Sequence, residues 1–538
     1  MTAPVEADAS GDLPLRGLRV VEVALATSDV GAGMATMLPG ALLRDLGAEV
    51  VRVQSARRST LDAGIEHARV WNRGKEVIAV DDDGAAADVA RPLLADADVA
   101  VLCGDEDLVE RRDLGYAALQ RLHPRLVVVR VRPSVNALGP VPDLELLVAA
   151  RAGVPTQIRH HEPGLPAFPD LPVAQAGAAL SATVGALVRL YEREITGVGG
   201  WAETSLYDGI QAMLPMILGR VEHHSPATTL LWKNQGPSEG LAYRCADGGY
   251  LQLWFGAKGA YEAFLAAMGD EPSEQGYNAD LVGGAMTARS ERWAARLATK
   301  DRARWLDELA GQPFRCEPVL LPGEALLDPH VRSTGLSIDH DDPGRGPITV
   351  LGPIQAVRPR PSAAATAHAG TGPLLTDVRV LDLSAYLAGP IGPLVLAELG
   401  ADVVKVEPVT GDVHRSMEPM YAAGQRGKRV IGLDLKAPDA ATVLERLFGW
   451  ADVVHHNSRL GLAEKLGYDE AAVRAANPNV IYSFASGFGE SGPRAPLPAN
   501  DHLMQALSGA EAAQGGHGQP PTFLAWAPST SPAAGCRR

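Results

Sequence analysis

Short apolar runs alternate with longer helical stretches near the N-terminus. Arg19–Val23 is a short apolar run, a helical stretch then continues to Leu46, and Glu49–Val53 is a second apolar run. This order is typical of the strand–helix–strand unit of a parallel sheet. Gly47 comes directly after the helical stretch, where a C-terminal helix cap belongs. The pattern therefore predicts a parallel sheet at the start of the chain.

The same pattern occurs twice. Leu18–Val23 is matched by Val378–Leu383, and Leu42–Val53 is matched by Val395–Val406. The spacing of the two matches differs by seven residues, so the first copy carries a seven-residue insertion near Gly31–Pro39. A match of this kind is too large for a solenoid repeat and predicts the duplication of a whole domain.

Both copies continue in the same order. Each has three more apolar runs separated by helical stretches, at Glu76–Val80, Ala97–Leu102 and Arg125–Val131 in the first copy and at Arg429–Leu433, Ala451–His455 and Asn479–Ser483 in the second. Strands that alternate with helices predict an open α/β sheet. The first copy adds a long helical stretch, Val173–Thr196, and a hairpin, Tyr243–Phe255, with an Asp247-Gly248 turn. The hairpin predicts a smaller α+β domain.

Local composition divides the chain further. Residues 358–374 are rich in Pro, Ala, Gly and Thr, which is typical of a linker. The predicted parts are a flexible N-terminal tail (1–14), a first repeat (15–357) with a large domain (about 15–225 and 331–357) and a small domain (about 226–330), the linker (358–374), a second repeat that holds only the N-terminal part of a large domain (375–528), and an aberrant tail (529–538).

Composition and charge narrow the class of protein. The chain of 538 residues is 46% hydrophobic and 21% charged, which fits a soluble globular protein. A formal net charge of −15 argues against nucleic acid and anionic membranes as partners. The four cysteines form no Cys-x-x-Cys pair, which argues against a zinc or disulfide framework and favours a reducing compartment. Met1–Pro14 has no leader pattern and no apolar run reaches membrane-spanning length, so we expect a cytoplasmic protein.

Ordered motifs resemble those of a known family. In the second copy they are the segments 381–390, 399–408, 427–436, 477–482 and 487–493, with Gly411-Asp412, Arg415 and Asn457. In the first copy they are 190–200, Glu317-Pro318-Val319 and Asp328-Pro329-His330-Val331. Together the motifs resemble the family III CoA-transferases, the group that includes formyl-CoA transferase and carnitine CoA-transferase. The resemblance implies a Rossmann-like open parallel sheet in a large domain, a small α+β domain and two interlocked rings, here duplicated in one tandem-fused chain.

The resemblance also implies a reaction. In this family CoA moves from one carboxylic acid to another through an acyl-aspartyl anhydride and an aspartyl-CoA thioester. Backbone amides stabilise the developing charge. The implied ligands are an acyl-CoA and a carboxylic acid, with no permanently bound cofactor and no metal. The implied assembly is an intramolecular pseudo-dimer or a homo-oligomer.

The aspartate nucleophile of the family is missing from the first copy. Val173–Gly177 reads Val-Ala-Gln-Ala-Gly where the family string resembles Val-Asp-Leu-Ala-Gly. Ala174, or Gln175 with a one-residue slip, therefore occupies the aspartate position, and neither is an effective nucleophile. Asp170 is a weak alternative that better fits a turn or a helix N-cap. We expect a catalytically silent first copy.

In the second copy the aspartate would follow Phe523–Pro528 almost directly. The chain instead reads Ser-Thr-Ser-Pro-Ala-Ala-Gly-Cys-Arg-Arg, which resembles nothing in the family. Codon degeneracy allows a one-base frame shift to turn Ser-Thr-Ser-Pro-Ala into Val-Asp-Leu-Ala-Gly. We therefore expect a frameshifted tail, a truncated second copy, and impaired or absent transfer activity.

Basic and polar residues mark a candidate CoA site in the second copy. The resemblance implies that the nucleotide part of CoA contacts Arg415, Lys428, Arg429, Asn457 and Lys465. Phosphate groups require such basic partners. The alternative interpretation is a solvated basic face.

The first copy matches this site less well. Cys103-Gly104 replaces the Asn457 position and an acidic run follows, which argues against CoA binding there; Cys103 itself fits a buried strand end. Trp232–Gly236 stands at the glycine-rich lid of the family, or is an ordinary loop. The remaining candidates lack the partners of a metal site and are expected to be surface residues: His160-His161, His223-His224 and His455-His456.

Two other functions stay open. An α-methylacyl-CoA racemase of the same superfamily would have a Gly-His-Asp string where this chain reads Ala499-Asn500-Asp501, without the histidine. A non-catalytic CoA-ester-binding protein fits Ala174 and the interrupted second copy. The CoA-transferase interpretation is favoured over both.

Overall fold

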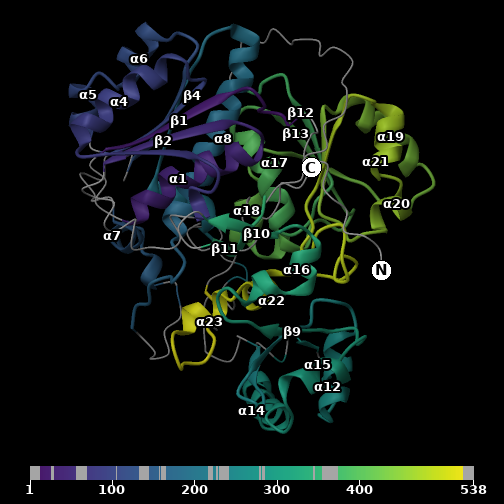
Figure 1. Cartoon of the computed structure of the whole chain (residues 1–538). Helices are drawn as coiled ribbons and strands as arrows, with labels where there is room; N and C mark the ends of the chain where they lie inside the picture. Colours follow the sequence, from purple (N-terminus) through teal and green to yellow (C-terminus); the bar gives the residue numbers. More distant parts are fainter. Residues whose placement is uncertain are drawn as a thin grey trace.

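The computed structural model describes residues 13–25, 30–55, 70–104, 106–132, 144–156, 158, 165–215, 222–223, 225, 228, 241–274, 276–277, 280, 285–342, 346–353 and 374–524. These residues form two parallel sheets, a three-stranded antiparallel sheet and a two-stranded hairpin. The parallel sheets lie in the upper half of Figure 1, and the antiparallel sheet lies below them with its helices. The predicted α/β class with an open parallel sheet is confirmed.

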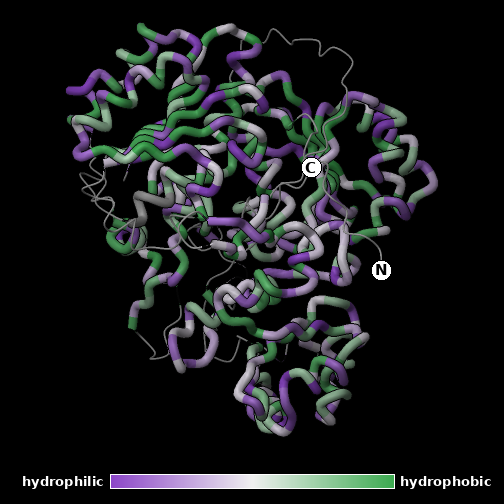
Figure 2. The backbone as a smooth tube through the Cα atoms, viewed as in Figure 1, coloured by the Kyte–Doolittle hydropathy of each residue, from purple (hydrophilic) through white to green (hydrophobic). Residues whose placement is uncertain are grey.

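The first sheet is built from strands of the first copy. Its order is β3-β2-β1-β4-β5-β6 and every pair is parallel. The strands are β1 (Arg19–Leu25), β2 (Glu49–Ser55), β3 (Glu76–Val80), β4 (Val99–Gly104), β5 (Val127–Arg132) and β6 (Trp201–Ser205). The central strands are buried on both faces and are rich in Val and Leu, as Figure 2 shows by their hydrophobic colour.

Helices cover both faces of this sheet. One face packs against α1 and α8, and the other packs against α4, α5 and α6. The helices are α1 (Val30–Asp45), α4 (Asp83–Ala95), α5 (Glu106–Arg111), α6 (Tyr116–Leu122), α7 (Glu145–Arg151), η1 (Val154–Thr156), α8 (Val173–Thr196) and α9 (Leu206–Met213). The alternate residues of each strand serve the two separate cores.

The second sheet repeats the strand order of the first. Its order is β14-β13-β12-β15-β16, parallel throughout, and within the described ranges it has no strand in the place of β6. The strands are β12 (Arg379–Asp382), β13 (Asp402–Glu407), β14 (Arg429–Gly432), β15 (Val453–His456) and β16 (Ile481–Phe484). The helices are α17 (Ala388–Glu398), η4 (Val413–Ser416), α18 (Glu418–Gln425), α19 (Ala440–Trp450), α20 (Leu462–Leu466) and α21 (Glu470–Ala476).

Helix α8 has the bounds that its sequence predicts and ends at Gly197, whose φ is 74°. Its 24 residues include an 18-residue window with a mean hydropathy of 1.4, enough for a membrane span by length and composition alone. The expectation that no apolar run reaches that length is therefore wrong. In this fold α8 packs on α1, α9, β5 and β6, and its apolar side chains belong to the core of the first copy.

The small antiparallel sheet has its own core. It has the order β7-β8-β9, and the predicted hairpin is confirmed by the pairing of Tyr243 with Leu251. Phe264, Trp293 and Phe314 pack edge to face beneath it. The elements are β7 (Ala242–Arg244), β8 (Tyr250–Trp254), α12 (Ala260–Met268), α14 (Ala285–Leu297), α15 (Arg302–Glu308) and β9 (Arg315–Val319). The chain leaves through η3 (Glu324–Leu327), α16 (Pro329–Ser333), β10 (Ser337–Asp342) and β11 (Gly346–Leu351).

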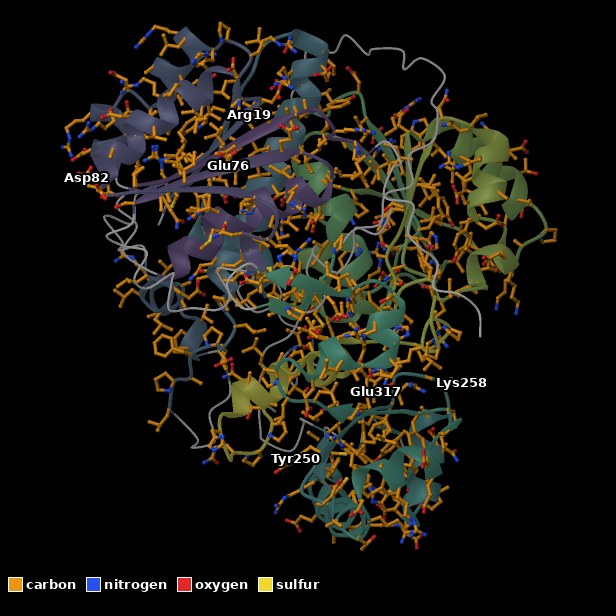
Figure 3. The ribbon with its side chains drawn as sticks, in the orientation of Figure 1. Arg19, Glu76, Asp82, Tyr250, Lys258 and Glu317 are labelled. Carbon is orange, nitrogen blue, oxygen red and sulfur yellow. The ribbon has the colours of Figure 1, made fainter. Side chains whose placement is uncertain are left out.

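The last described segment of the second copy packs on the first copy. Helices α22 (Asp501–Ser508) and α23 (Ala510–Gly515) lie between the small sheet and the rest of the molecule in Figure 1. α22 contacts β8, β9 and η3. Arg494 reinforces the joint, because its Nη1 donates to Asp328 Oδ1 at 2.8 Å and its Nε lies 3.6 Å from Glu317 Oε2. Figure 3 shows Glu317 at the end of the small domain that faces the rest of the chain.

Several predictions concern residues that the structure does not describe. They are the N-terminal tail up to residue 12, residues 358–373 of the linker, the Trp232–Gly236 segment, His160, His161, His224 and the tail at 529–538. The domain boundaries stay predictions. His223 is exposed and Cys103 is buried at the end of β4, as expected.

Candidate functional site

The second sheet has a switch point between β12 and β15. From β12 the strand order continues to β13 and β14 on one side and to β15 and β16 on the other. In open parallel sheets, ligands bind at such a point, outside the carboxyl ends of the strands. Ala385 lies three residues after β12, and Asn457 directly follows β15. Both residues therefore border the position where a ligand is expected.

Asn457 joins the two loops at this edge. Its Oδ1 accepts a hydrogen bond from the Ala385 N–H at 2.9 Å, and its Nδ2 donates to the Ala385 C=O at 2.8 Å. Gly389 lies against this pair, and a Cβ on Gly389 would lie only 2.6 Å from Asn457 Cγ. The side-chain amide thus fixes the backbone of the loop after β12. We call this pair of hydrogen bonds the Asn457 clamp.

Tyr386 lies in the loop that the clamp holds. Its φ is 65°, in the left-handed region that few non-glycine residues adopt. Its side chain is 55% exposed, and its ring centre lies 5.7 Å from that of His414. Strained backbone of this kind persists where surrounding contacts enforce it, and it clusters at ligand sites. The loop therefore presents an aromatic ring to solvent at the switch point.

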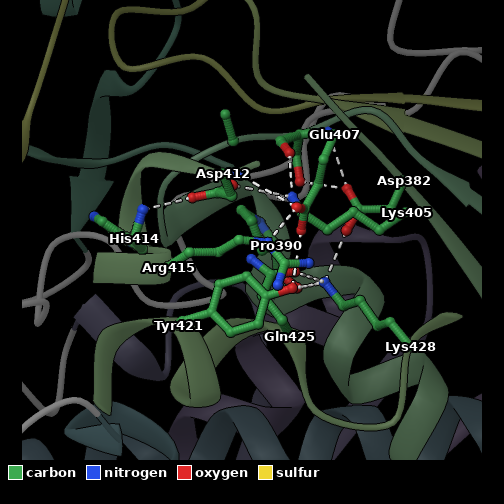
Figure 4. Close-up of polar contacts among 12 residues, drawn as sticks. Asp382, Pro390, Lys405, Glu407, Asp412, His414, Arg415, Tyr421, Gln425 and Lys428 are labelled. Carbon is green, nitrogen blue, oxygen red and sulfur yellow. Dashed lines mark hydrogen bonds and ion pairs between the residues drawn. The ribbon is translucent and has the colours of Figure 1, made fainter. Parts of the chain in front are cut away.

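Buried ammonium groups hold the base of the same loop. Lys428 Nζ donates to Asp382 Oδ2 at 2.7 Å and to the Pro390 C=O at 2.7 Å, and Lys405 Nζ donates to the Ser384 C=O at 2.7 Å (Figure 4). The side chains of Lys428 and Asp382 are fully buried. Burial acts to raise the pKa of Asp382, but Lys428 and Lys405 outweigh it, so the pKa is lowered. Lys428 therefore lies beneath the loop rather than on its surface.

A second ion pair orients the Arg415 side chain at the same edge of the sheet. Glu407, the last residue of β13, accepts hydrogen bonds from Arg415 Nε at 2.7 Å and from Tyr421 Oη at 2.9 Å. The Arg415 guanidinium lies 4.5 Å from the centre of the Tyr421 ring and is 47% exposed. The hydrogen bond to Glu407 raises the pKa of Arg415. A charged, half-exposed and oriented guanidinium results, which is suited to an anion.

Two other predicted binding residues lie elsewhere. Lys465 is exposed on α20, eight residues after Asn457. Arg429 binds Asp402 at the start of β13, with Nε at 2.9 Å and Nη2 at 2.6 Å, and its guanidinium lies 6.0 Å from the Trp450 ring centre. Because Asp402 is at the amino end of β13, Arg429 faces away from the switch point. Two of the predicted basic residues therefore remain candidates for ligand contact. Arg415 is half-exposed at the candidate edge, and Lys465 is exposed in the segment that follows β15.

The two histidines at the end of β15 are buried, so the expectation that they lie on the surface is wrong. His455 makes hydrogen bonds with Ser483 Oγ at 2.9 Å and with the Gly389 C=O at 3.0 Å. His456 Nε2 pairs with Tyr482 Oη at 2.7 Å. Burial lowers the pKa of His455. These rings support the loop and the sheet edge from within.

The first copy has a buried ion pair that matches Lys428 and Asp382, but the residue in the place of Asn457 differs. Lys75 Nζ donates to Glu22 Oε2 at 2.9 Å, and burial lowers the pKa of Lys75 to about 8. Cys103 occupies the place of Asn457, because Glu22 pairs with Val101 in the first sheet as Asp382 pairs with His455 in the second. A thiol lacks the separate acceptor and donor atoms of an amide, so the Asn457 clamp cannot form in the first copy.

A carboxylate outside the predicted set holds the start of α8. Glu145 Oε1 accepts from the Ala174 N–H at 2.9 Å, and Glu145 Oε2 accepts from the Gln175 N–H at 3.1 Å. An anion is stabilised by these amides and by the helix dipole. Glu145 opens α7 as Asp501 opens α22, each eight residues before a glycine with positive φ. This internal match was the signal that could have identified Glu145 from sequence.

Asp170 lies beside this helix start without capping it. Its side chain is exposed, and its backbone N–H donates to Gln514 Oε1 at 2.9 Å. The N-cap of α8 is Pro172, which makes no side-chain cap hydrogen bond, so of the two expected places for Asp170 the helix N-cap is wrong. Asp170 lies in a bend, in keeping with the turn. Its catalytic role stays a weak prediction.

The strand order and the clamped loop define an open α/β fold with an ordered loop at its switch point, the place where such folds bind ligands. The sequence model of CoA-transferase family III matches residues 15–369 and 375–534. These matches cover most of the chain, and the protein therefore belongs to CoA-transferase family III.

Individual relatives match in part. Succinate--glutarate CoA-transferase of Agrobacterium fabrum is 41% identical over 153 residues, which are 26% of this chain and 38% of that protein. Probable CoA-transferase Rv1866 of Mycobacterium tuberculosis is 25% identical over 530 residues, 87% of this chain and 65% of that protein. Alpha-methylacyl-CoA racemase of Mus musculus is 36% identical over 148 residues, 28% of this chain and 37% of that protein. The chain spans about two-fifths of the length of several relatives that it matches.

Solved structures share the fold. The crystal structure of Rv3272 from M. tuberculosis in its orthorhombic form aligns with a TM-score of 0.50 at 22% identity, over 66% of this chain and 95% of that chain. A CAIB/BAIF family protein from Brucella suis aligns with a TM-score of 0.50 at 20% identity, over 63% and 92% of the two chains. These likenesses support the fold alone.

Proposed function

We propose that this protein serves the transfer of CoA between carboxylic acids, and that the second copy holds the CoA ester at the carboxyl ends of β12 and β15. Family membership supports the reaction class. The Asn457 clamp supports the position and carries the proposal, because it shapes an exposed loop at the switch point. In the first copy, Cys103 stands in the place of Asn457, and a thiol cannot form such a clamp.

The basic residues of the second copy take different parts in this proposal. Arg415 and Lys465 supply positive charge to the phosphate groups of CoA. Glu407 orients Arg415, so little side-chain freedom is lost when a phosphate binds. Lys428 acts indirectly, because it holds the Pro390 C=O in the first turn of α17, directly after the loop. Arg429 faces the amino end of the sheet and makes no contact with the ligand.

The proposed chemistry needs a carboxylate nucleophile. An aspartate oxygen attacks the thioester carbon of the donor, the C–S bond breaks, and CoA leaves as a thiolate to give an acyl-aspartyl anhydride. The thiolate attacks the aspartyl carbonyl, and the donor acid leaves as a carboxylate. The acceptor carboxylate then attacks the aspartyl-CoA thioester and displaces the thiolate, which attacks the acceptor carbonyl and frees the aspartate.

This chain places no such carboxylate at the positions that the family resemblance indicates. Ala174 and Gln175 stand there in the first copy, and residues 525–538 contain no Asp or Glu. We therefore propose that this chain binds the CoA ester and that its own transfer rate is impaired. Acyl-CoA and a carboxylic acid are the proposed ligands.

Calorimetry and a transfer assay together test the proposal. The names of the relatives suggest the pairs: succinyl-CoA with glutarate, mesaconate or D-citramalate, and acetyl-CoA with oxalate. We expect saturable CoA binding and slow or undetectable transfer. No CoA binding would contradict the site, and rapid transfer by the purified chain would contradict the impaired step.

A non-catalytic CoA-ester-binding protein is the second candidate. The observation that favours it is the Glu145 carboxylate, which occupies the amides of Ala174 and Gln175 at the start of α8. Binding without transfer for every acid, including in complexes with other chains, would support this candidate. The racemase is disfavoured, because Asn500, in the place of its histidine, is the N-cap of α22 and accepts from the Leu503 N–H at 3.1 Å.

The proposed assembly is an intramolecular pseudo-dimer, and the proposed location is the cytoplasm. The ion pair of Arg494 with Asp328 and the hydrogen bond of His330 Nε2 with the Phe488 C=O at 2.7 Å support the assembly, since both join the two copies. Size-exclusion chromatography with light scattering tests it, and a mass of one chain is expected.

A further inference from the structure

Glu511 is a buried acid that the proposed chemistry does not use. It is the second residue of α23 and is 1% exposed. Neither of its carboxyl oxygens has a hydrogen-bond partner among the residues that the structure describes. A buried carboxylate without partners is strongly disfavoured, whereas a neutral carboxylic acid in the same place is disfavoured far less. The protonation state of Glu511 therefore matters to the packing of α23.

The ionisable groups of the neighbouring helix do not compensate Glu511. α22 contributes Asp501, which is 7% exposed, and His502, whose ring stacks on Phe523 with the centres 4.2 Å apart. Residues 520–524, which pass beside α23, carry no ionisable side chain. Burial raises the pKa of Glu511 well above its usual value, and the Asp501 carboxylate raises it further.

Helix α23 belongs to the joint between the copies. Gln514 Nε2 donates to the Phe168 C=O at 3.1 Å, and its Oε1 accepts from the N–H of Asp170, whose own side chain is exposed. Leu524 lies in the core of the first copy, and its N–H donates to Gln505 Oε1 at 3.0 Å. The segment 501–524 thus docks as one piece, with Glu511 inside it.

We propose that Glu511 makes the docking of the segment 501–524 onto the first copy sensitive to pH: the segment docks with Glu511 protonated, and ionisation of Glu511 favours its release. In the released segment Glu511 faces water and has an ordinary pKa of about 4.3. The docked carboxyl holds its proton to higher pH. Docking is therefore strongest below the ordinary pKa and weakens as the pH rises towards the docked pKa. This proposal does not depend on CoA transfer.

Hydrogen–deuterium exchange of the whole chain between pH 5 and pH 8 tests this proposal. Protection factors, corrected for the intrinsic effect of pH, are compared for peptides from 501–524 and from the second sheet at 379–407. We expect the protection of 501–524 to fall by up to about tenfold per pH unit, because one proton is released on opening. The sheet peptides should show no such fall.

Two variants and a control complete the experiment. Glu511→Gln keeps the size and removes the ionisation, so the protection of 501–524 should no longer depend on pH. Glu511→Leu should remove the dependence and raise protection at pH 8. Glu464→Gln, at an exposed position on α20, should behave as the wild type. Protection in the wild type that does not change with pH, or an unchanged pH dependence in Glu511→Gln, would overturn the proposal.

Discussion

The side-chain amide of Asn457 bonds both backbone polar groups of Ala385. Its Oδ1 accepts from the Ala385 N–H at 2.9 Å, and its Nδ2 donates to the Ala385 C=O at 2.8 Å. The two residues follow different strands, β15 and β12, and are 72 residues apart in the chain. Since only an amide side chain can accept and donate in this way, the pair fixes the loop at the switch point in one shape.

Asn457→Ala should weaken CoA binding by about tenfold. Each lost hydrogen bond costs about 1 kcal/mol, and the freed loop must be ordered again when the ligand binds. Isothermal titration of CoA measures the change. Asn477→Ala is the matched control, because Asn477 Nδ2 donates to the Ala451 C=O away from the switch point. Equal affinities for wild type and Asn457→Ala would show that the clamp has no role in binding.

Arg415→Gln should lower CoA affinity and reduce its dependence on salt. A charge-assisted hydrogen bond to a phosphate contributes about 1.5–3 kcal/mol, so a loss of tenfold or more is expected. Titrations at several salt concentrations measure both effects. Arg426→Gln is the control, since Arg426 is exposed and pairs with Glu398. If both variants behave alike, Arg415 contributes only general surface charge.

Lys428→Met should destabilise the second copy by about 3–5 kcal/mol, because it removes the cation that hydrogen-bonds the fully buried Asp382 carboxylate. The double variant Asp382→Leu with Lys428→Met should recover much of this loss. Urea unfolding measures both free energies. Lys436→Met, at an exposed position, is the control and should change little. A single variant as stable as the wild type would contradict the buried pair.

Acid should destabilise the second copy around Asp382 and the loop after β12. The pKa of Asp382 is lower in the fold than in the unfolded chain, so its stabilisation is complete only above about pH 5 and is lost progressively as the pH falls towards the folded pKa. The free energy of unfolding should therefore decrease between pH 5 and pH 3. Asp382→Asn should flatten this part of the pH profile, and an equally steep profile in that variant would assign the acid sensitivity to other groups.

Glu145→Gln should destabilise the first copy by about 1–2 kcal/mol, because a neutral amide is a weaker partner for the α8 amides and the helix dipole than a carboxylate. Thermal and urea unfolding measure the effect. Glu49→Gln, at an exposed position on β2, is the control. Identical stabilities for the two variants would remove Glu145 from this role.

Local sequence patterns were sufficient for most of the elements. The bounds of α8, the hairpin around Gly248 and the repeated strand order follow from hydrophobic periodicity and turn residues, which act over a few positions. Family motifs also led to Asn457 at the switch point. These predictions depend on interactions between residues that are close in the sequence, or on contiguous family motifs.

The direction of side chains required the tertiary structure. Lys428 and Arg429 are neighbours in one motif, yet one is buried against Asp382 and the other is exposed against Asp402. Glu145 reaches α8 from 29 residues away. The buried His455 ring bonds the Gly389 C=O of helix α17, which is 66 residues away in the chain. Such contacts are set by the packing of distant segments, which no local pattern records.

We propose CoA binding at the switch point of the second copy and not of the first. Hydrogen–deuterium exchange with and without CoA distinguishes the two copies. CoA should protect residues 383–390 and 457–466 and leave the matching strand end of the first copy, residues 99–104, unchanged. Protection at 99–104, or exchange at 383–390 that saturating CoA does not alter, would contradict the proposal.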